Sequence, residues 1–330
     1  MSEKYEQTYG SREDVALSTP QITELIYSHN IAELRQHLKE YLAQKGTLWI
    51  LIDGIDKGWP STGLEGEDLL IIRALIDASR KLEQDFSKAK IEVVPLVFLR
   101  NDVYELLVQE TSDRGKVTHV RLDWTDRDVM REMLKRRVLA NEAYGEEADF
   151  EHDVWPQICV THCDGAETID LLIDRSLMRP RFFLDLITLC KGSAVNLGHD
   201  RIDESDIVKG IEAYSSNLLT DIGYEIGDIS EDGDQLLYDF LGCSSILGAS
   251  ELVEILQVHQ GEDKHHKLIR LLLWYGFLGV LVDGQEPVYI YSPNVNYNMA
   301  TLSALIRKQG QSLKYQINQA FWPALLIEES

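Results

Sequence analysis

Residues 48–56 read LWILIDGID, and the interpretation of the first third of the chain depends on this stretch. An apolar run without alternation is typical of a parallel strand that is buried on both faces. Asp53 ends the run, and Asp56 follows three residues later. Ligands of open α/β sheets bind at the carboxyl ends of the strands, so both carboxylates are candidates for metal or nucleotide chemistry. The plainer alternative is a strand that ends in Asp because Asp-Gly favours a turn.

The sequence around this strand alternates between helical and strand patterns. Residues 1–19 are polar and predict a loose tail. Helices are expected over 20–46 and 67–86, and buried strands over 91–99 and 117–122. Strands that alternate with helices predict a parallel α/β sheet, which we assign to residues 20–124.

Beyond residue 124 the pattern becomes helical. An all-α domain is expected over 125–226, and it is followed by an acidic, turn-rich linker candidate at 227–233. Three helices and two short apolar strands come next, and they predict a winged helix-turn-helix domain over 227–300. The short strands are expected over 279–282 and 288–291, and a helical extension over 301–330.

The composition is that of a globular chain with a large acidic excess. The 330 residues include 32 Lys and Arg against 55 Asp and Glu, which gives a formal net charge of −23. No signal peptide or apolar run of about 18 residues is recognisable, so no membrane partner is expected. Four cysteines without paired spacing are typical of a reducing compartment, and we expect a cytoplasmic protein.

The charge of the predicted winged domain bears on nucleic-acid binding. Its third helix carries the basic residues and is the element that enters the major groove in DNA-binding relatives of this motif. However, residues 231–300 hold ten acidic residues and three Lys or Arg, a net charge of −7. This balance predicts no appreciable binding to duplex DNA at physiological salt and favours an intramolecular or protein–protein role.

Two smaller clusters each allow a plain and a functional interpretation. The first has metal-ligand residue types at a spacing that fits no standard zinc pattern, which favours cysteines that pack between helices. It consists of Cys159, His162 and Cys163, with His152 nearby. The second is a basic helix, interpreted as a solvated face or alternatively as a docking surface for phosphate or an acidic partner. Its cations are Arg127, Arg131, Lys135, Arg136 and Arg137.

Four segments resemble parts of the P-loop ATPases of the AAA+ and signal-transduction (STAND) type. LWILIDGID is similar to the Walker B strand with a second acidic residue, and VVPLVFLRND at 93–102 resembles the sensor-one strand. RLDWTDRDVMREMLKRRV at 121–138 resembles the step into the helical lid, and MRPRFFLDLI at 178–187 resembles the lid helix with its sensor-two arginine. The segments follow the family's order over roughly residues 48–220.

The resemblance implies ATP and Mg²⁺ as cofactors and gives each site residue a role. Asp53 would hold the magnesium ion through water, and Asp56 would orient the attacking water. Arg100 would face the terminal phosphate, while Arg179 or Arg181 would read it from the lid. Prokaryotic members of this broad kind often serve in defence or stress signalling, which extends to this chain by analogy alone.

The sequence departs from the family at the phosphate-binding loop, because no G-x-x-x-x-G-K-[ST] pattern is present. The single Gly-Lys pair, Gly115-Lys116, lacks the earlier glycine and precedes an expected strand. Residues 1–46 also contain no apolar strand that would lead into such a loop. We therefore expect the regulatory or sensor portion of an ATPase that is truncated, split or read from a late start, and that does not hydrolyse ATP alone.

The missing strand has a structural consequence. In the family it lies between the sensor-one strand and the last core strand, so its absence predicts unpaired strand edges and a partner protein or self-association. Hydrolysis would require a Walker A segment from another chain or from a missing N-terminus. The alternative function is a non-enzymatic winged-helix adaptor or interaction protein derived from such an ATPase.

Overall fold

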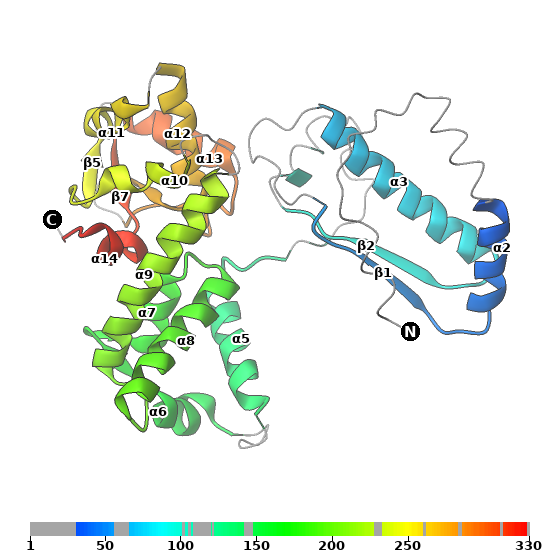
Figure 1. Cartoon of the computed structure of the whole chain (residues 1–330), viewed down its shortest axis with the longest axis horizontal. Coiled ribbons are helices and arrows are strands. Elements are labelled where there is room, and N and C mark those ends of the chain that lie inside the picture. The colour runs from blue at the N-terminus through cyan, green and yellow to red at the C-terminus, as the bar shows by residue number, and fades with distance from the viewer. Residues whose placement is uncertain are drawn as a thin grey trace. The chain divides into compact units, whose positions relative to one another are not determined.

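The computed structural model of the chain divides into two compact units, which are described separately (Figure 1). The first unit comprises residues 1–57 and 65–100, and the second comprises 58–64 and 101–330. The structure describes residues 31–55, 66–100, 103–104, 107, 120, 122–141, 148–227, 233–259, 262–282, 286–310 and 313–328. No helix in these ranges combines the length and apolar character needed to span a membrane.

The first unit is built on a parallel pair of strands. These are β1 (Leu48–Ile52) and β2 (Val93–Val97), and the helix α3 (Gly66–Lys88) lies between them in the sequence. Leu48 is opposite Val93 and Ile52 is opposite Val97. The mixed α/β class and the parallel orientation predicted for these strands are therefore confirmed. The third predicted strand, 117–122, falls almost wholly outside the described residues.

The two faces of this β-pair differ in their cover. One face packs against α3 and α2 (Ile31–Leu42) through a small buried cluster. The cluster consists of Leu42, Phe86, Ile91 and Val93, with Leu48, Ile50 and Leu82 against it. The opposite face carries Trp49, Leu51 and Leu96, whose exposed fractions are 59%, 63% and 38%. Parallel sheets are normally covered on both faces, and the described part of this unit covers one.

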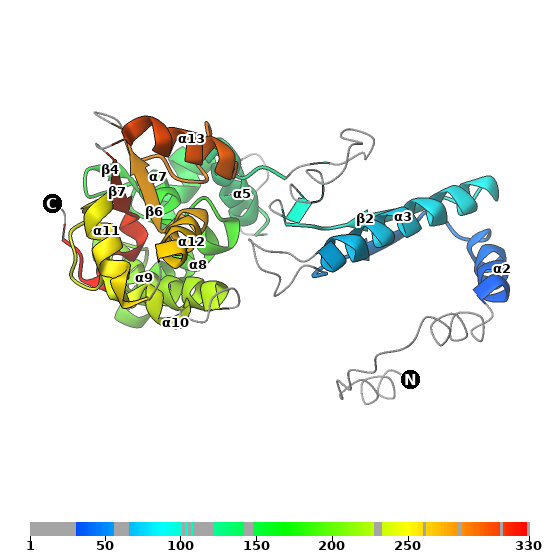
Figure 2. The ribbon, with the colours of Figure 1, turned by 90° about the horizontal axis from the view of Figure 1, so that it is seen from above.

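The second unit begins with a helical domain. Its main helices are α5 (Arg127–Leu139), α7 (Thr168–Arg175), α8 (Pro180–Leu197) and α9 (Glu204–Gly227). A π-helical turn (Phe150–Val154), α6 (Trp155–Ile158) and the two-residue strands β3 (His162–Cys163) and β4 (Ala166–Glu167) separate α5 from α7. The helices α8 and α9 lie side by side and form the centre of the domain (Figures 1 and 2).

The α8–α9 contact is close because glycine occupies the crossing point. A Cβ atom on Gly210 would lie 2.4 Å from the Cys190 Sγ and 2.8 Å from the Cys190 backbone N and Cα. The connection between the helices starts at Gly198, whose φ of +75° is a left-handed helix ending that favours glycine. These two glycines therefore fix how the hairpin closes and how near its helices approach.

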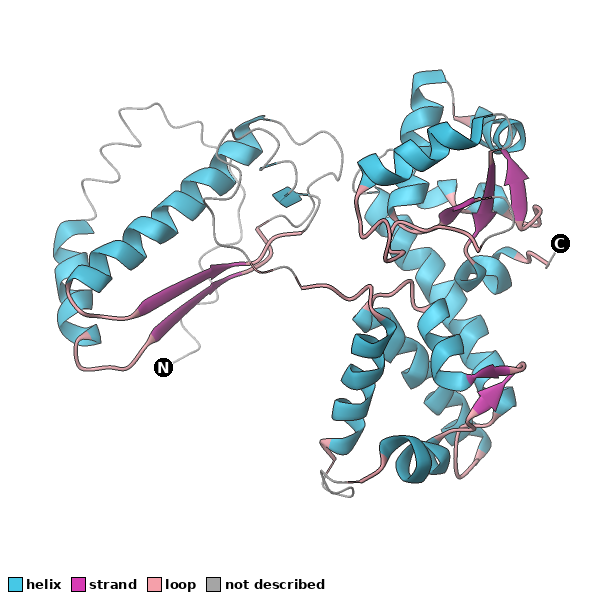
Figure 3. Cartoon of the chain, turned by 180° about the vertical axis from the view of Figure 1, so that it is seen from behind, coloured by secondary structure: helices cyan, strands magenta, loops and turns pink. Residues whose placement is uncertain are grey.

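The C-terminal part of the second unit combines short helices with a small antiparallel sheet (Figure 3). Its helices are α10 (Gly233–Leu236), α11 (Ala249–Ile255), α12 (Glu262–Trp274), α13 (Met299–Gln309) and α14 (Trp322–Leu325). Its strands are β5 (Ile246–Gly248), β6 (Leu278–Leu281) and β7 (Lys314–Ile317), in the order β5-β7-β6. Single 3-10 turns lie at Tyr238–Phe240, Leu256–Val258 and Gln319–Phe321.

This sheet corrects one expectation from the sequence. The segment 288–291 was predicted to be a strand, but Val288 forms an isolated bridge with Val280 instead. The central strand is β7, which lies in the region predicted to be a helical extension. Tyr315 and Ile317 are buried, whereas Lys314 is exposed, which is the alternation of a strand that packs one face on a core.

Candidate functional site

Asp53 lies at the carboxyl end of β1, where the sequence predicted it. Its side chain is exposed, and its Oδ1 accepts a hydrogen bond of 2.8 Å from the Gly54 N–H. Gly54 has a φ of +71°, so the strand ends in the local turn that Asp-Gly favours. The turn uses one carboxylate oxygen and leaves the other available to a ligand. The turn and the ion-binding interpretations are thus compatible.

Arg100 follows β2 by three residues and is half-buried. Ile52 and Val97 are partners in register, and the Phe98 N–H donates to the Ile52 carbonyl at 2.9 Å. Because β1 and β2 are parallel, the residues that follow them lie at the same edge of the sheet. The structure therefore brings Asp53 and Arg100 to one edge, while Asp56 lies outside the described residues.

Arg179 lies at the start of α8 and contacts several elements. Its guanidinium carbon is 5.1 Å from the Phe182 ring centroid and 6.0 Å from that of Tyr275. Its Nη1 lies 3.3 Å from each carboxylate oxygen of Glu225, near the end of α9. The Tyr275 hydroxyl donates a hydrogen bond of 3.2 Å to the Glu225 backbone carbonyl. Arg179 is thus the centre of a junction between α8, α9 and the segment that follows α12.

The two candidate sensor arginines differ in their surroundings. The side chain of Arg179 is 25% exposed and ion-paired, whereas Arg181 is exposed on the first turn of α8. Pro180 is the first helical residue, and no side chain caps this helix end. The first-turn N–H groups and the helix dipole therefore favour an anion at this point.

The predicted basic face of α5 is largely neutralised by neighbouring carboxylates. Arg131 contacts Glu167 at 2.7 and 3.0 Å and Asp170 at 2.8 Å. Arg127 contacts Asp170 at 3.1 Å and also pairs with Asp174. Arg136 pairs with Glu132 one turn earlier at 2.7 Å. These three cations hold α5 to α7 or pair within α5. Lys135 and Arg137 are exposed, and no ion pair links them to another residue in the described part of the chain.

The cysteine–histidine cluster separates into buried and exposed parts. Cys159 and Cys163 are buried core residues, whereas His152 and His162 are exposed. Burial raises the pKa of the Cys159 thiol to about 12, which keeps it protonated at neutral pH. A protonated thiol is a poor metal ligand and a poor nucleophile. The arrangement is that of cysteines packed in a core, which the spacing favoured.

Sequence reasoning missed a polar cluster at the start of α9. The carboxylate of Asp206 is fully buried and accepts hydrogen bonds from His199 Nδ1 at 2.8 Å, Ser193 Oγ at 2.9 Å and the Asp203 N–H at 3.1 Å. The Asp206 N–H donates in turn to Asp203 Oδ1 at 3.0 Å. This reciprocal pair is a helix-capping arrangement, and the D-x-x-D spacing of Asp203 and Asp206 was the signal for it.

The contacts within this cluster shift the pKa values of His199 and Asp206. The hydrogen bond to Asp206 and the charge of Asp203 raise the pKa of His199. Burial raises the pKa of Asp206, but hydrogen bonds from His199, the Asp203 backbone and Ser193 outweigh it, so the pKa of this carboxyl is lowered. Oxygen and nitrogen atoms of His199, Asp203 and Asp206 lie within 4.8 Å of one another, as in a cation site. However, the protein itself already satisfies both Asp206 oxygens.

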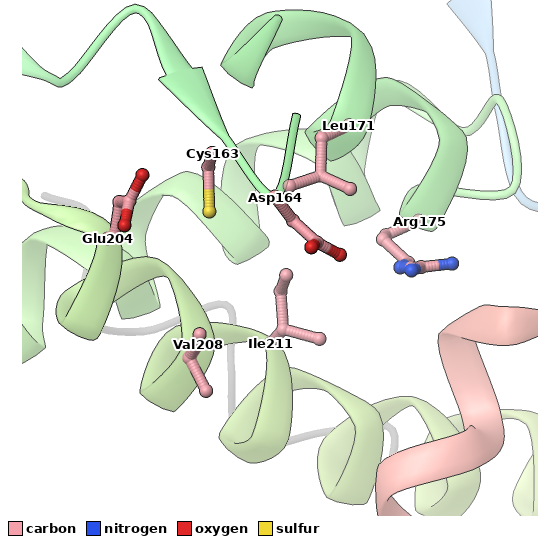
Figure 4. A pocket seen from close by; sticks show the side chains of 7 residues that line it. All are labelled: Cys163, Asp164, Leu171, Arg175, Glu204, Val208 and Ile211. Atoms are coloured by element: carbon pink, nitrogen blue, oxygen red, sulfur yellow. The ribbon is translucent and has the colours of Figure 1, made fainter. Parts of the chain in front are cut away.

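A pocket of about 410 Å³ lies between the β3–β4 turn, α7 and α9 (Figure 4). Aliphatic side chains from both helices line it together with charged groups and one thiol. The lining residues are Cys163, Asp164, Leu171, Arg175, Glu204, Val208 and Ile211. Arg175 also contacts Gln319. Burial raises the pKa of Cys163, so the pocket lacks an activated nucleophile.

Comparisons with known proteins gave matches to a family model and to a solved structure. Residues 128–223, from α5 to α9, match the family model of the FunZ-associated C-terminal helical domain. No curated protein matches the sequence. The crystal structure of Cdc6p from Pyrobaculum aerophilum was found at 12% identity, covering 85% of each chain, with a TM-score of 0.30.

Proposed function

We propose that this chain is the regulatory portion of a P-loop ATPase and receives its phosphate-binding loop from another polypeptide. The observation that carries the proposal is the sheet edge where Asp53 follows β1 and Arg100 follows β2, its parallel neighbour. A carboxylate in this position can hold magnesium through water, and a nearby cation can face a terminal phosphate. Asp56 is proposed to orient the attacking water.

The uncovered face of the first unit supports a partner. Trp49, Leu51 and Leu96 form an apolar face that remains exposed, and an isolated strand pair is marginal in water. A polypeptide that adds strands and a covering layer would complete the sheet and could bring the missing phosphate cradle. The partner is therefore proposed to be a protein, and a second copy of the chain is the alternative.

The helical domain would then act as the lid. Arg179 and Arg181 lie at an uncapped helix N-terminus, a position that suits phosphate oxygens. The match of residues 128–223 to a helical domain model supports a separate module in this region. In this proposal the lid binds the phosphate, and the C-terminal part changes its interactions in response. The C-terminal part would be a variant of the winged helix in which β7 is the central strand.

The second candidate is a non-enzymatic adaptor. It is favoured by the absence of a Walker A pattern from the sequence and by the pairing of Arg179 with Glu225. The net charge of −7 over residues 231–300 argues for protein rather than DNA as the partner of its C-terminal module.

The two candidates differ in whether Asp53 binds a metal–nucleotide complex. The test is equilibrium dialysis of the full chain against Mn²⁺·ATP, together with an assay for phosphate release. We expect at most weak binding and no turnover, because the sequence contains no Walker A pattern, and a further loss of binding in Asp53→Asn and Arg100→Gln. The matched control is Asp77→Asn, which removes one exposed carboxylate from α3. Equal affinity of Asp53→Asn and Asp77→Asn for Mn²⁺·ATP would support the adaptor. Mg²⁺-dependent ATP hydrolysis by the chain alone would disprove the proposal that another polypeptide supplies the phosphate-binding loop.

A further inference from the structure

The pocket between the β3–β4 turn, α7 and α9 has an aliphatic wall that follows the spacing of both helices. Glu204, Val208 and Ile211 recur along one face of α9 at intervals of four and three residues. Leu171 and Arg175 are one turn apart on α7 and line the same space. Val208 is 51% exposed. The aliphatic side chains thus lie between two charged ends, with Glu204 at one end and Arg175 at the other (Figure 4).

Two carboxylates of this pocket have no hydrogen-bond or ion-pair partner in the described part of the chain. They belong to Asp164 and Glu204. Asp164 and Gly165 form the two-residue β3–β4 turn, and both have the positive φ that a type I′ turn requires. Glu204 is the first residue of α9, where the helix dipole favours an acidic side chain. Each acid has a local reason for its position, but neither reason requires that both line one pocket.

The Cys163 thiol points into the pocket between these two carboxylates. Cys163 is 4% exposed, and its Sγ forms no hydrogen bond within the described residues. Figure 4 shows the sulfur directed from β3 toward α9, with Glu204 on one side and Asp164 on the other. Burial and the charges of Glu204 and Asp164 raise the pKa of this thiol. The electrostatic fields of both carboxylates therefore reach one point of the pocket wall.

We propose that this pocket binds a primary alkylammonium group, with the ammonium near Asp164 and Glu204 and the aliphatic stem along α7 and α9. The three N–H donors of an ammonium suit carboxylate oxygens and the weak acceptor of a thiol. The stem packs against Leu171, Val208 and Ile211, whose burial favours binding. The net charge of −23 adds a general attraction for cations. The site lies in the second unit and shares no residue with the proposed nucleotide site.

Arg175 restricts which amines fit. It lies at the end of the pocket opposite Glu204 and contacts Gln319 (Figure 4). Its positive charge repels a second ammonium at that end. The pocket therefore favours one ammonium on an aliphatic stem over a diamine of the same length. A free alkylamine and the lysine side chain of a polypeptide both carry this group.

The test is a titration of the full chain with n-butylamine, measured by saturation-transfer difference NMR. The wild type should bind n-butylamine about fivefold more tightly than 1-butanol, its uncharged analogue, and more tightly than 1,4-diaminobutane. Glu204→Gln and Asp164→Asn should each weaken n-butylamine binding by about fivefold. Asparagine tolerates a positive φ, so Asp164→Asn keeps the turn. The matched control is Glu212→Gln, an exposed position on α9 with the same change in charge, which should leave the affinity unchanged.

Thiol modification gives a second readout at the site itself. Saturating n-butylamine should slow the reaction of Cys163 with methyl methanethiosulfonate, measured by mass spectrometry of the modified peptide. The internal control is Cys243, which does not line the pocket and should react at an unchanged rate. Modification of Cys163 that is equally fast with and without bound amine would contradict binding at this position.

The two sources of the group are separated by a third probe, Nα-acetyl-lysine N-methylamide. Tighter binding of this probe than of n-butylamine identifies a lysine in a polypeptide as the ligand, and weaker binding identifies a free amine. Equal affinity for n-butylamine in the wild type, Glu204→Gln and Asp164→Asn would overturn the inference. Tighter binding of 1,4-diaminobutane than of n-butylamine would also overturn it, because general attraction to an acidic surface favours the larger charge.

Discussion

The two units bury their apolar residues to different extents. In the second unit Phe183, Phe277 and Phe321 are fully buried, and one continuous cluster runs from Met130 to Ile327. The first unit has a buried cluster of four residues, while Trp49 and Leu51 on the other face of its sheet are about 60% exposed. A closed core is typical of a domain that is stable by itself. The apolar face left in water is the surface at which we propose that another polypeptide binds.

The largest difference in stability between the two units is expected when a phenylalanine in each is replaced by alanine. Phe183 on α8 is 0% exposed, so Phe183→Ala leaves a cavity and should cost about 3–5 kcal/mol of unfolding free energy. Phe98 follows β2 and is 41% exposed. Phe98→Ala should cost about 1 kcal/mol or less. Urea unfolding followed by circular dichroism measures both. Equal losses would mean that the first unit is as well packed as the second.

A smaller loss is expected where α8 and α9 cross. Gly210→Ala puts a Cβ atom against the Cys190 backbone, so the helices must separate at a cost of about 1–3 kcal/mol. Gly192→Ala on α8 meets no atom within 4 Å and should instead stabilise the chain by about 0.4–1 kcal/mol. Thermal unfolding of the two variants should therefore shift in opposite directions. A shift of the same sign would disprove the close contact.

The stability of the second unit should depend on pH through His199, with an effect smaller than that of the substitutions above. Its pKa is raised above the ordinary 6.5, so the stability from its pairing with Asp206 is complete below that value and is lost as pH rises through the raised pKa. The pKa of Asp206 is lowered, so this carboxylate stays charged over the same range. The melting temperature should fall as pH rises above 6.5, and His199→Gln should flatten this fall. His162→Gln, at an exposed histidine, should leave the pH profile unchanged.

The smallest stability change is expected on the exposed face of the first unit. Leu51 is 63% exposed, so Leu51→Thr should change the free energy of unfolding by no more than about 0.5 kcal/mol. If this face binds another chain, the substitution should still weaken association, measured by sedimentation velocity. Leu70→Thr on α3, at a residue 58% exposed, is the control that should leave association unchanged. A marked loss of stability in Leu51→Thr would show that this face is covered within the chain.

Local pattern was sufficient to predict the strands of the first unit. Each of β1 and β2 is a short apolar run. The residues between these two runs have the apolar spacing of a helix. The strand β7 could not be recognised in this way, because the four residues KYQI are too few to establish a period. Its alternation became visible only once its place between β5 and β6 was known.

The candidate site was harder to predict, because its arginines form ion pairs with residues that are distant in the sequence. The role of Arg179 was inferred from the local segment MRPRFF, but its partner Glu225 lies 46 residues further along the chain. The carboxylates that neutralise Arg127 and Arg131 are likewise distant in sequence, with Glu167 in β4 and Asp174 on α7. Charge counts along a sequence therefore overestimated the free cations of α5. The roles of Asp53, Asp56 and Arg100 stay predictions until nucleotide binding is measured.

The position of β7 in its sheet determines the order in which the C-terminal module can assemble. Synthesis proceeds from the N-terminus, so β5 and β6 both emerge before the strand that joins them. Until residues 314–317 are made, each of these strands has an unpaired edge, a surface prone to incorrect pairing with other chains. A chain that stops between Leu281 and Lys314 would lack the middle of its sheet rather than a peripheral segment.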